Sequence, residues 1–199
     1  MHRLPVACWS RPWNMVAQRK SRRIATPPIV MAASDGELAV VKAELKKKGA
    51  NVDAVDRGGG TALHQAACNH HVHVVAALLH AGADARIADD RGLTALHFAA
   101  RELQPEIAKL LIEAGAEVGA QDQNGNTPLF EAVFATEDDP ATIQLLVAAG
   151  ADMKRKNKHG VSPLGLAQDV DHPNLEKWLR SAPPPAALAT KTRRGAVRR

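Results

Sequence analysis

Residues 89–118 read DDRGLTALHFAARELQPEIAKLLIEAGAEV, and the rest of the chain follows the pattern of this stretch. Its tetrapeptide TALH, which begins at Thr94, also begins at Thr61, 33 positions earlier, and returns as TPLF at Thr127, 33 positions later. A related tetrapeptide, SPLG, begins at Ser162 after a further 35 positions. Self-similarity at a fixed period of this size indicates a fold of stacked repeats, in which each small unit packs on its neighbours.

The composition favours a helical fold with an aliphatic core. Of the 199 residues 45% are hydrophobic, but the chain has only three Phe, three Trp and no Tyr. Ala and Leu dominate, which suits closely packed helices better than a sheet sandwich. The apolar runs are short, so we expect a soluble chain without a membrane span. The two cysteines, Cys8 and Cys68, form no CxxC pair; we therefore expect no disulfide framework and a reducing compartment.

The charges divide the chain into an acidic middle and two basic ends. All 21 acidic residues lie between Asp35 and Glu176, whereas only 14 of the 26 Lys and Arg lie in residues 35–179. That middle part therefore carries a net charge of about −7, and the two ends carry the other 12 basic residues. A dedicated nucleic-acid groove would place its basic residues on the folded surface, so this distribution argues against one.

Each repeat carries the local signals of two short helices. In residues 56–88, Thr61 is placed to cap the N-terminus of a first helix, whose apolar positions share one face. A turn at residues 69–70 leads to a second helix, and Gly82 can adopt the positive φ that ends it. The segment that joins one repeat to the next is predicted to form an extended hairpin with an Asp-x-x-Gly turn at its tip.

Five prolines obey the same register. Proline is tolerated at the first position of a helix and disrupts a helix interior. We therefore expect second helices to begin at Pro105, Pro140 and Pro173, and first helices to begin at Pro128 and Pro163.

These motifs resemble the ankyrin-repeat family, whose pattern is an Asp-x-x-Gly-x-Thr-Pro-Leu-His-x-Ala-Ala opening, a Val-Val-x-Leu-Leu helix and a Gly-Ala-Asp ending. Here the pattern stands as DRGGGTALHQAA with GADA, DDRGLTALHFAA with GAEV, and DQNGNTPLFEAV with GADM. The resemblance implies an all-α ankyrin-repeat solenoid of about five helix-turn-helix repeats with β-hairpin fingers and disordered basic tails. The expected domain covers residues 27–180, with repeats at about 27–55, 56–88, 89–121, 122–156 and 157–180.

The expected end repeats depart from the pattern. The first, from residue 27, lacks the signature Thr and His, as a terminal repeat with one free face can. Its run of three lysines from Lys46 is expected in the last turn of a helix. The fourth has Phe130 at the His position and two extra residues within 135–139. The fifth is short, and we expect Trp178 to pack inward there.

The two ends are predicted to be disordered basic segments. Residues 1–26 show no helical or alternating apolar pattern, and residues 181–199 are rich in Pro, Ala and Arg. Met15 is an alternative start, so translation of residues 1–14 stays an open question. We expect a cytoplasmic protein, although an Arg-rich, acid-free leader also fits import into an organelle if the source is eukaryotic.

Histidines provide the candidate chemistry, and most of it has a structural explanation. The family resemblance implies that His64 and His97 bond to the backbone of the neighbouring hairpin. Cys68, His70, His71 and His73 combine the ligand types of a zinc site, but adjacent turn residues rarely converge on one ion. No catalytic, cofactor or metal site is predicted, because no nucleophile with a base, paired carboxylates or phosphate-binding Gly loop is present.

The resemblance places the partner-contacting positions around the turn Gly and after the Ala-Ala pair. They are Arg57, Cys68, Asn69, Asp90, Arg91, Leu93, Arg101, Glu102, Gln123, Asn124, Asn126, Phe134, Lys158 and His159. Among them, Leu93 and Phe134 are expected to be apolar anchors exposed to water. The hairpins are also polarised, because the second and third are acidic and the last, from Lys154 to His159, is basic.

The sequence therefore predicts a non-enzymatic protein of monomeric form that binds an unidentified protein partner through a concave surface. Two alternatives remain open. The closing NKHGVSPL segment resembles small bacterial ankyrin proteins, some of which act as immunity or antagonist partners of toxins or enzymes. The basic tails could instead bind nucleic acid or an anionic membrane, with the steep salt dependence of such contacts.

Overall fold

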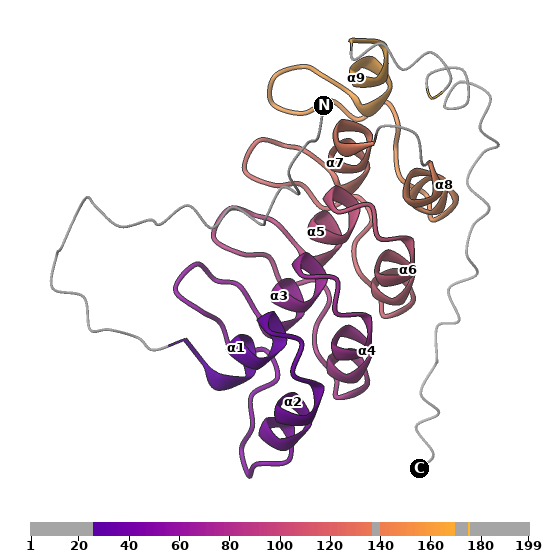
Figure 1. The fold of residues 1–199 in the computed structure, drawn as a ribbon. Coiled ribbons are helices and arrows are strands. Elements are labelled where there is room, and N and C mark those ends of the chain that lie inside the picture. The colour runs from indigo at the N-terminus through magenta and orange to yellow at the C-terminus, as the bar shows by residue number, and fades with distance from the viewer. Residues whose placement is uncertain (1–25, 137–139, 170–174, 176–199) are drawn as a thin grey trace, which may run out of the picture.

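The computed structural model describes residues 26–136, 140–169 and 175, and within these residues it contains nine helices and no strand. Figure 1 shows the helices stacked as consecutive pairs. Their bounds are α1 Pro28–Ser34, α2 Leu38–Leu45, α3 Ala62–Cys68, α4 Val72–His80, α5 Ala95–Arg101, α6 Pro105–Glu113, α7 Pro128–Ala135, α8 Ala141–Ala148 and α9 Pro163–Asp169. No helix in this described part is long and apolar enough to cross a bilayer.

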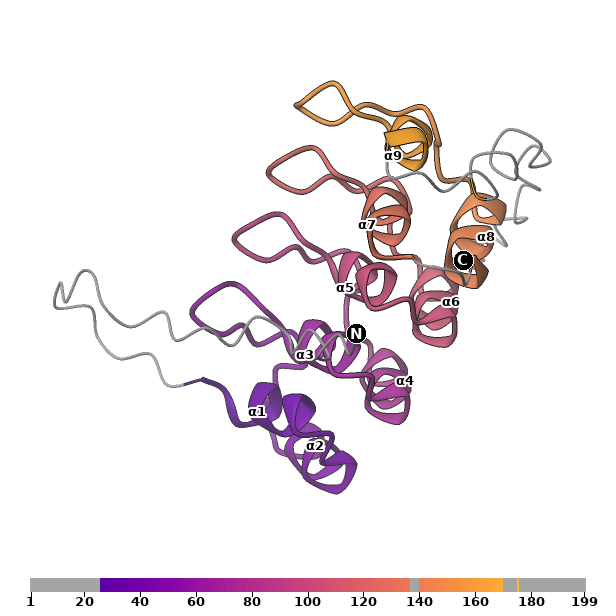
Figure 2. The same ribbon diagram turned by 45° about the horizontal axis from the view of Figure 1, so that its top comes forward.

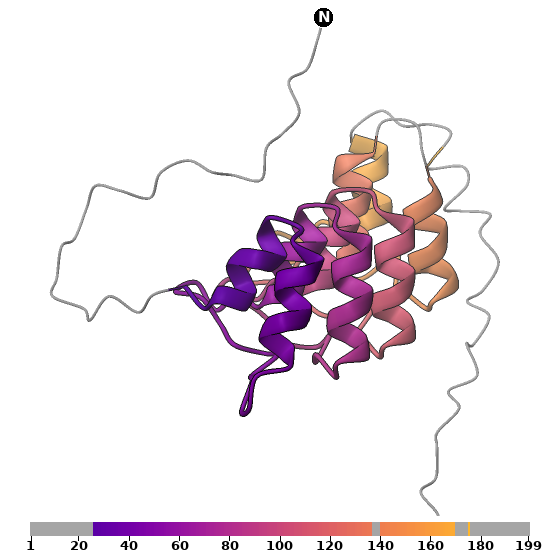
Figure 3. The ribbon, with the colours of Figure 1, turned by 60° about the horizontal axis from the view of Figure 1, so that its bottom comes forward.

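The first helices of the pairs form one row and the second helices form another. Figure 2 shows α1, α3, α5, α7 and α9 between the loops and the row of second helices, and Figure 3 shows the helices side by side from another direction. The loops of residues 51–60, 84–93, 117–126 and 152–161, here called the first to fourth fingers, project on the side of the first helices. The surface formed by the first helices and the four fingers is here called the inner face.

The predicted helix starts are largely confirmed. Pro105, Pro128 and Pro163 are first residues of α6, α7 and α9. Helix α8 begins one residue later than expected, at Ala141, so Pro140 is its N-cap residue. Pro173 lies outside the described residues. The Lys46 prediction is wrong by one residue, because α2 ends at Leu45 and the lysine run begins at its C-cap.

An aliphatic core runs along the whole stack between the two rows of helices. Leu63, Leu96 and Leu129 occupy one register position in successive first helices and are at most 2% exposed. Paired alanines such as Ala99 and Ala100 are fully buried on the same helices, because a small side chain allows neighbouring helices to approach closely. The stack is therefore stabilised by contacts between nearest-neighbour repeats, as in other solenoids.

The fingers share one backbone conformation, and each has the predicted turn at its tip; in the second finger, Gly92 N donates to Asp89 O at 2.9 Å. The antiparallel pairing beside the turns is short, because among the described residues it is limited to two isolated bridges, Val55 with Thr61 and Ala88 with Thr94. Each turn glycine has φ between +75° and +80°. The second finger donates a hydrogen bond from Asp90 N to Gly58 O of the first at 2.9 Å. Equivalent bonds join the later fingers, so the fingers form a regular stack.

The domain limits at residues 27 and 180, the disordered tails and the inward packing of Trp178 remain predictions, because they depend on residues outside the described part. Four complete helix pairs and α9 account for four repeats and the beginning of a fifth.

Candidate partner-binding face

Two buried histidines connect consecutive repeats. The Nδ1 atoms of His64 and His97 lie 3.1 and 3.0 Å from the backbone N of the capping threonine of the same helix. An N–H group can only donate, so Nδ1 accepts and Nε2 carries the proton. Nε2 of His64 then donates to Leu93 O at 3.1 Å, and Nε2 of His97 donates to Asn126 O at 3.3 Å. The predicted bonds to the neighbouring finger backbone are confirmed.

Burial determines the protonation state of these two rings. It lowers the pKa of both His64 and His97 below the ordinary histidine value, and the carbonyl that each Nε2 contacts opposes this effect only in part. The neutral rings therefore serve as fixed connections between a first helix and the next finger.

A chain of polar contacts crosses three repeats on the inner face. Arg101 on α5 contacts Glu131 on α7 with 2.8 Å between Nη2 and Oε2. Asn126 donates to the other Glu131 oxygen at 3.3 Å, and Asn157 of the fourth finger donates to Asn126 Oδ1 at 2.9 Å. Glu131 is only 7% exposed, and a buried carboxylate requires such partners.

This network joins Arg101 and Asn126, which the sequence had predicted as contact positions, to two residues that it had missed. Glu131 follows the signature position of its repeat, and Asn157 replaces the Asp that begins the turn of the other fingers. The position of each residue within its repeat could have marked both as candidates. Their side-chain partners could not be predicted, because these depend on the distance between repeats. The network fixes the orientation of polar groups on α5, α7 and the last two fingers.

A second group of contacts joins the second finger to the first helices. The guanidinium carbon of Arg91 lies 5.8 Å from the centre of the Phe98 ring, a cation–π distance. The Phe98 ring in turn meets His64 edge to face, with 5.9 Å between ring centres. Arg91 also forms an ion pair with Asp89 at 2.9 Å. Arg91 is therefore held in place before any partner arrives.

The predicted contact residues occupy three kinds of position. Phe134 is 68% exposed on α7, as expected for an anchor. The exposed finger residues are Arg57, Asp90, Arg91, Gln123, Asn124, Lys158 and His159. The half-buried residues are Cys68, Asn69, Arg101, Glu102 and Asn126.

The prediction that Leu93 is an exposed anchor is wrong, because its side chain is only 4% exposed. Leu93 lies at the base of the second finger, where its N–H donates to Asp89 Oδ1 at 2.9 Å and its carbonyl accepts from Asp89 N at 2.8 Å. The same carbonyl accepts the His64 bond. These bonds hold the backbone against the helices, so the side chain is buried between repeats instead of reaching water.

The histidines near the turn at residues 69–70 contact different partners and do not converge on one site. His71 Nε2 lies 3.0 Å from Ser34 O, which joins the first two repeats. His70 Nε2 lies 3.5 Å from Glu102 Oε2, and His70 takes the left-handed conformation with φ of 64°. No three ligand-type side chains of the described residues come together at a position that could hold a metal ion.

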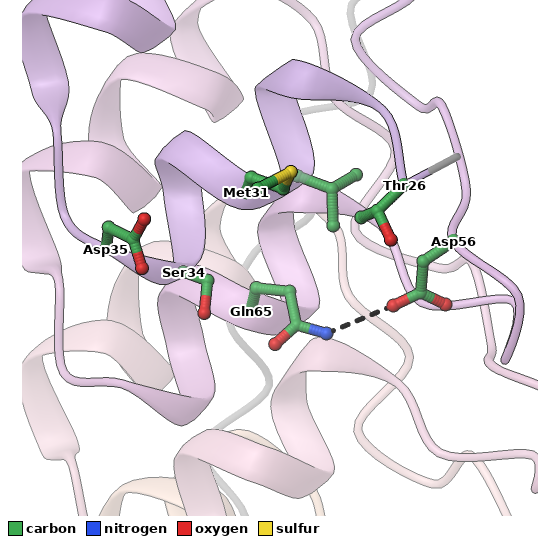
Figure 4. Close-up of a pocket in the computed structure, with 7 residues that line it drawn as sticks. Thr26, Met31, Ser34, Asp35, Asp56 and Gln65 are labelled. Atoms are coloured by element: carbon green, nitrogen blue, oxygen red, sulfur yellow. Dashed lines mark hydrogen bonds between the residues drawn. The ribbon is translucent and has the colours of Figure 1, made fainter.

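An open hollow of about 290 Å³ lies at the N-terminal end of the inner face, and Figure 4 shows the residues that line it. Met31, which is 55% exposed, and Val30 give it an apolar side. Asp56 lies on the opposite side and accepts a hydrogen bond from Gln65 at 3.2 Å. The hollow therefore combines apolar and acidic groups, which suits a side chain of a larger partner.

The inner face offers a partner protein a contact surface with charged groups at fixed positions. Among the described residues, the titrating groups whose pKa values shift are the two buried histidines, Asp84 and Arg86. The hydrogen bonds from Arg86 hold the pKa of Asp84 at about 2. All four groups take part in contacts that hold a finger or a helix in place.

The comparison with known families agrees with this geometry. A family profile described as "Ankyrin repeats (3 copies)" matches residues 29–122, 78–157 and 104–184, so the matches extend over most of the chain. A search of curated proteins gives no match. The matched residues include the helix pairs from α1 to α8. The chain belongs to the ankyrin-repeat family.

Proposed function

We propose that the chain is a non-enzymatic binding protein that holds a protein partner on its inner face. Ankyrin repeats generally mediate protein–protein interactions, and the family is generally an interaction scaffold without catalytic activity. The partner and the surface that binds it are the specific parts of this proposal.

One observation supports the inner face above all: among the described residues, three of the four large exposed apolar side chains lie on first helices or fingers. Met31 on α1, Val55 in the first finger and Phe134 on α7 are 55%, 46% and 68% exposed. In the described part of the chain, Val40 on α2 is the fourth large apolar side chain of this kind, and it is 39% exposed. Exposed aromatic and apolar groups of this kind act as anchors in protein interfaces.

Rigid surroundings add to this argument. The network of Arg101, Glu131 and Asn126 borders the helix that carries Phe134, and its contacts are between 2.8 and 3.3 Å. A partner therefore meets a surface that loses little conformational freedom when it binds, which favours affinity. Burying a Phe side chain from water contributes about 1.5–3 kcal/mol, enough to change a dissociation constant by roughly ten-fold or more.

Affinity capture with matched variants tests the proposal. The tagged chain and its Phe134→Arg variant are exposed to an extract of the source organism, and the retained proteins are quantified by mass spectrometry. Val40→Arg is the control, since it places the same charge on an exposed apolar position of a second helix. We expect Phe134→Arg to lose the partner and Val40→Arg to keep it. Equal retention by both variants refutes the assignment of the inner face.

A further inference from the structure

The fourth finger has the backbone of the other fingers but lacks their carboxylate. In the second finger, Asp89 Oδ1 accepts two turn N–H groups, both at 2.9 Å. In the third finger, Asp122 Oδ1 accepts the equivalent groups at 2.8 and 2.7 Å. Asn157 occupies this position in the fourth finger and accepts at 2.9 and 3.0 Å. The turn needs an acceptor oxygen, and the amide supplies it without the negative charge.

The replacement of Asp by Asn157 accompanies a change in the sign of the finger charges along the stack. With His neutral, the first three fingers carry formal charges of −1, −1 and −2, whereas the fourth carries four Lys and Arg against Asp152 alone, a charge of +3. In the second finger, Arg86 and Arg91 are neutralised by carboxylates of the same loop at 2.9 Å. In the fourth finger, Lys154, Lys156 and Lys158 are exposed, and no described carboxylate forms an ion pair with them.

The backbone of the fourth finger is nevertheless held firmly. Lys158 N donates to Asn124 O at 2.9 Å, and Asn157 donates to Asn126 at 2.9 Å. Arg155 donates to Gly119 O and to Gln121 Oε1, at 3.2 and 3.0 Å. The three lysines therefore extend from a loop that is anchored to the third finger.

On the far side of this finger, the described part of the chain holds no further finger. A Cβ atom at Gly125 would lie 2.9 Å from Lys158 N of the next finger, whereas one at Gly160 would meet no described atom within 4 Å. The carbonyl of Asn124 accepts a hydrogen bond from the next finger. The equivalent carbonyl of His159 receives none from the described residues. Within the residues that the structure describes, this side therefore presents a backbone carbonyl that receives no hydrogen bond, next to Lys158.

We propose that the open side of the fourth finger binds a carboxylate-rich segment of the protein partner. This inference rests on the proposed function and assigns chemistry to one end of the same face. Carboxylates complement the three lysines, and a backbone N–H of the same segment complements the free carbonyl of His159.

The rest of the finger stack decides between an acidic protein segment and an extended polyanion. The first three fingers all carry net negative charge, so they repel a nucleic acid or an anionic membrane lying along the stack. A protein can place acidic residues at the fourth finger and neutral or basic residues beside the others, which also fixes its direction on the face.

Cross-linking with a defined probe tests this inference on the full chain. A labelled oligoglutamate peptide is mixed with the protein, and carbodiimide joins its carboxylates to nearby lysine amines. Mass spectrometry then compares Lys154, Lys156 and Lys158 with the lysine run that begins at Lys46. That run is the control, since its three lysines are also exposed, although Lys47 forms an ion pair with Glu44 at 2.6 Å.

We expect preferential cross-linking at the fourth finger and its decline as salt is raised. Asn157→Asp restores the carboxylate of the other fingers while it keeps the acceptor oxygen. It should therefore weaken oligoglutamate binding at this finger roughly three- to ten-fold at low salt. Because it also removes the 2.9 Å bond from Asn157 to Asn126 Oδ1, it should lower the unfolding temperature by only about 2–4 °C. Equal yields at the two lysine runs, yields confined to lysines near the chain ends, or no effect of Asn157→Asp overturn the proposal.

Competition separates carboxylate from phosphate recognition. Oligoglutamine should fail to compete with the probe. If an RNA oligonucleotide of equal charge or phosphatidylserine vesicles protect the finger lysines better than oligoglutamate does, the proposal is wrong. Failure of the proposed function is a different result: partner capture is then insensitive to Phe134→Arg, while oligoglutamate still reacts at the fourth finger.

Discussion

Replacing His97 with Phe should destabilise the folded chain by about 2–4 kcal/mol. The ring of His97 is fully buried and joins two repeats through Thr94 N–H at 3.0 Å and Asn126 O at 3.3 Å. A phenyl ring fills the space of the imidazole, which is slightly smaller, but it forms neither hydrogen bond. Phe130 occupies the equivalent position of α7, so a first helix of this protein accepts the phenyl shape and the variant should fold.

The magnitude follows from the two groups that lose their partner. Thr94 N–H becomes a buried donor without an acceptor, which costs about 1–3 kcal/mol. Asn126 O keeps its bond from Asp122 N at 3.0 Å, so its loss is limited to one ordinary hydrogen bond, worth about 1 kcal/mol. For a chain of this size each kcal/mol shifts the unfolding temperature by roughly 2–4 °C. The variant should therefore unfold roughly 5–15 °C below the wild type.

Thermal and urea unfolding followed by circular dichroism measures this difference. His73→Phe is the control, because His73 is exposed on α4 and its replacement should change stability by no more than about 0.5 kcal/mol. If His97→Phe is as stable as His73→Phe, the histidine bonds do not contribute to the connection between repeats.

Three further predictions follow from the geometry of the fingers and the histidines. Burial depresses the pKa of His64 and His97, so their stabilising effect should be complete above about pH 6.5 and decline as the pH falls toward the folded-state values. Thermal unfolding between neutral and mildly acidic pH should show this loss, and a variant with Phe at both positions should show a smaller one. Gly125→Ala should be less stable than Gly160→Ala by about 1 kcal/mol or more in urea unfolding, because both have positive φ but only the first would contact the next finger. Asp89→Asn should keep the acceptor for the two turn N–H groups of its finger, whereas Asp89→Ala should lose it. The free energy of unfolding of Asp89→Ala, measured in urea, should therefore be lower by about 1–3 kcal/mol.

The local signals in the sequence predicted most of the fold. Thr94 caps α5 and Pro105 begins α6, as their positions in the repeat indicated. Such features are governed by neighbouring residues and by the hydrogen bonds of helix ends, which a single sequence contains. The family resemblance also predicted the histidine bonds, although the distance between repeats was not available from the sequence.

The candidate site was predicted less completely, because exposure depends on how the repeats stack. Phe134 is exposed as predicted, whereas Leu93, also expected to be exposed, is buried at the base of its finger. The contact of Arg101 with Glu131 spans 30 residues of sequence, and nothing in the local pattern indicates that the two side chains meet. The sequence shows Asn157 where the other fingers have Asp. The structure adds that the amide oxygen of Asn157 accepts the same two turn N–H groups, so the turn does not need the carboxylate charge.

A photo-cross-linking measurement tests the proposed inner face most directly. Benzoylphenylalanine is placed at position 134 in one protein and at position 40 in another, and each is irradiated in an extract of the source organism. We predict that a discrete protein adduct forms from position 134, whose native Phe is 68% exposed on α7. Position 40 on α2 should give no such adduct. The same adduct from both positions, or an adduct from position 40 alone, would contradict partner binding on the inner face.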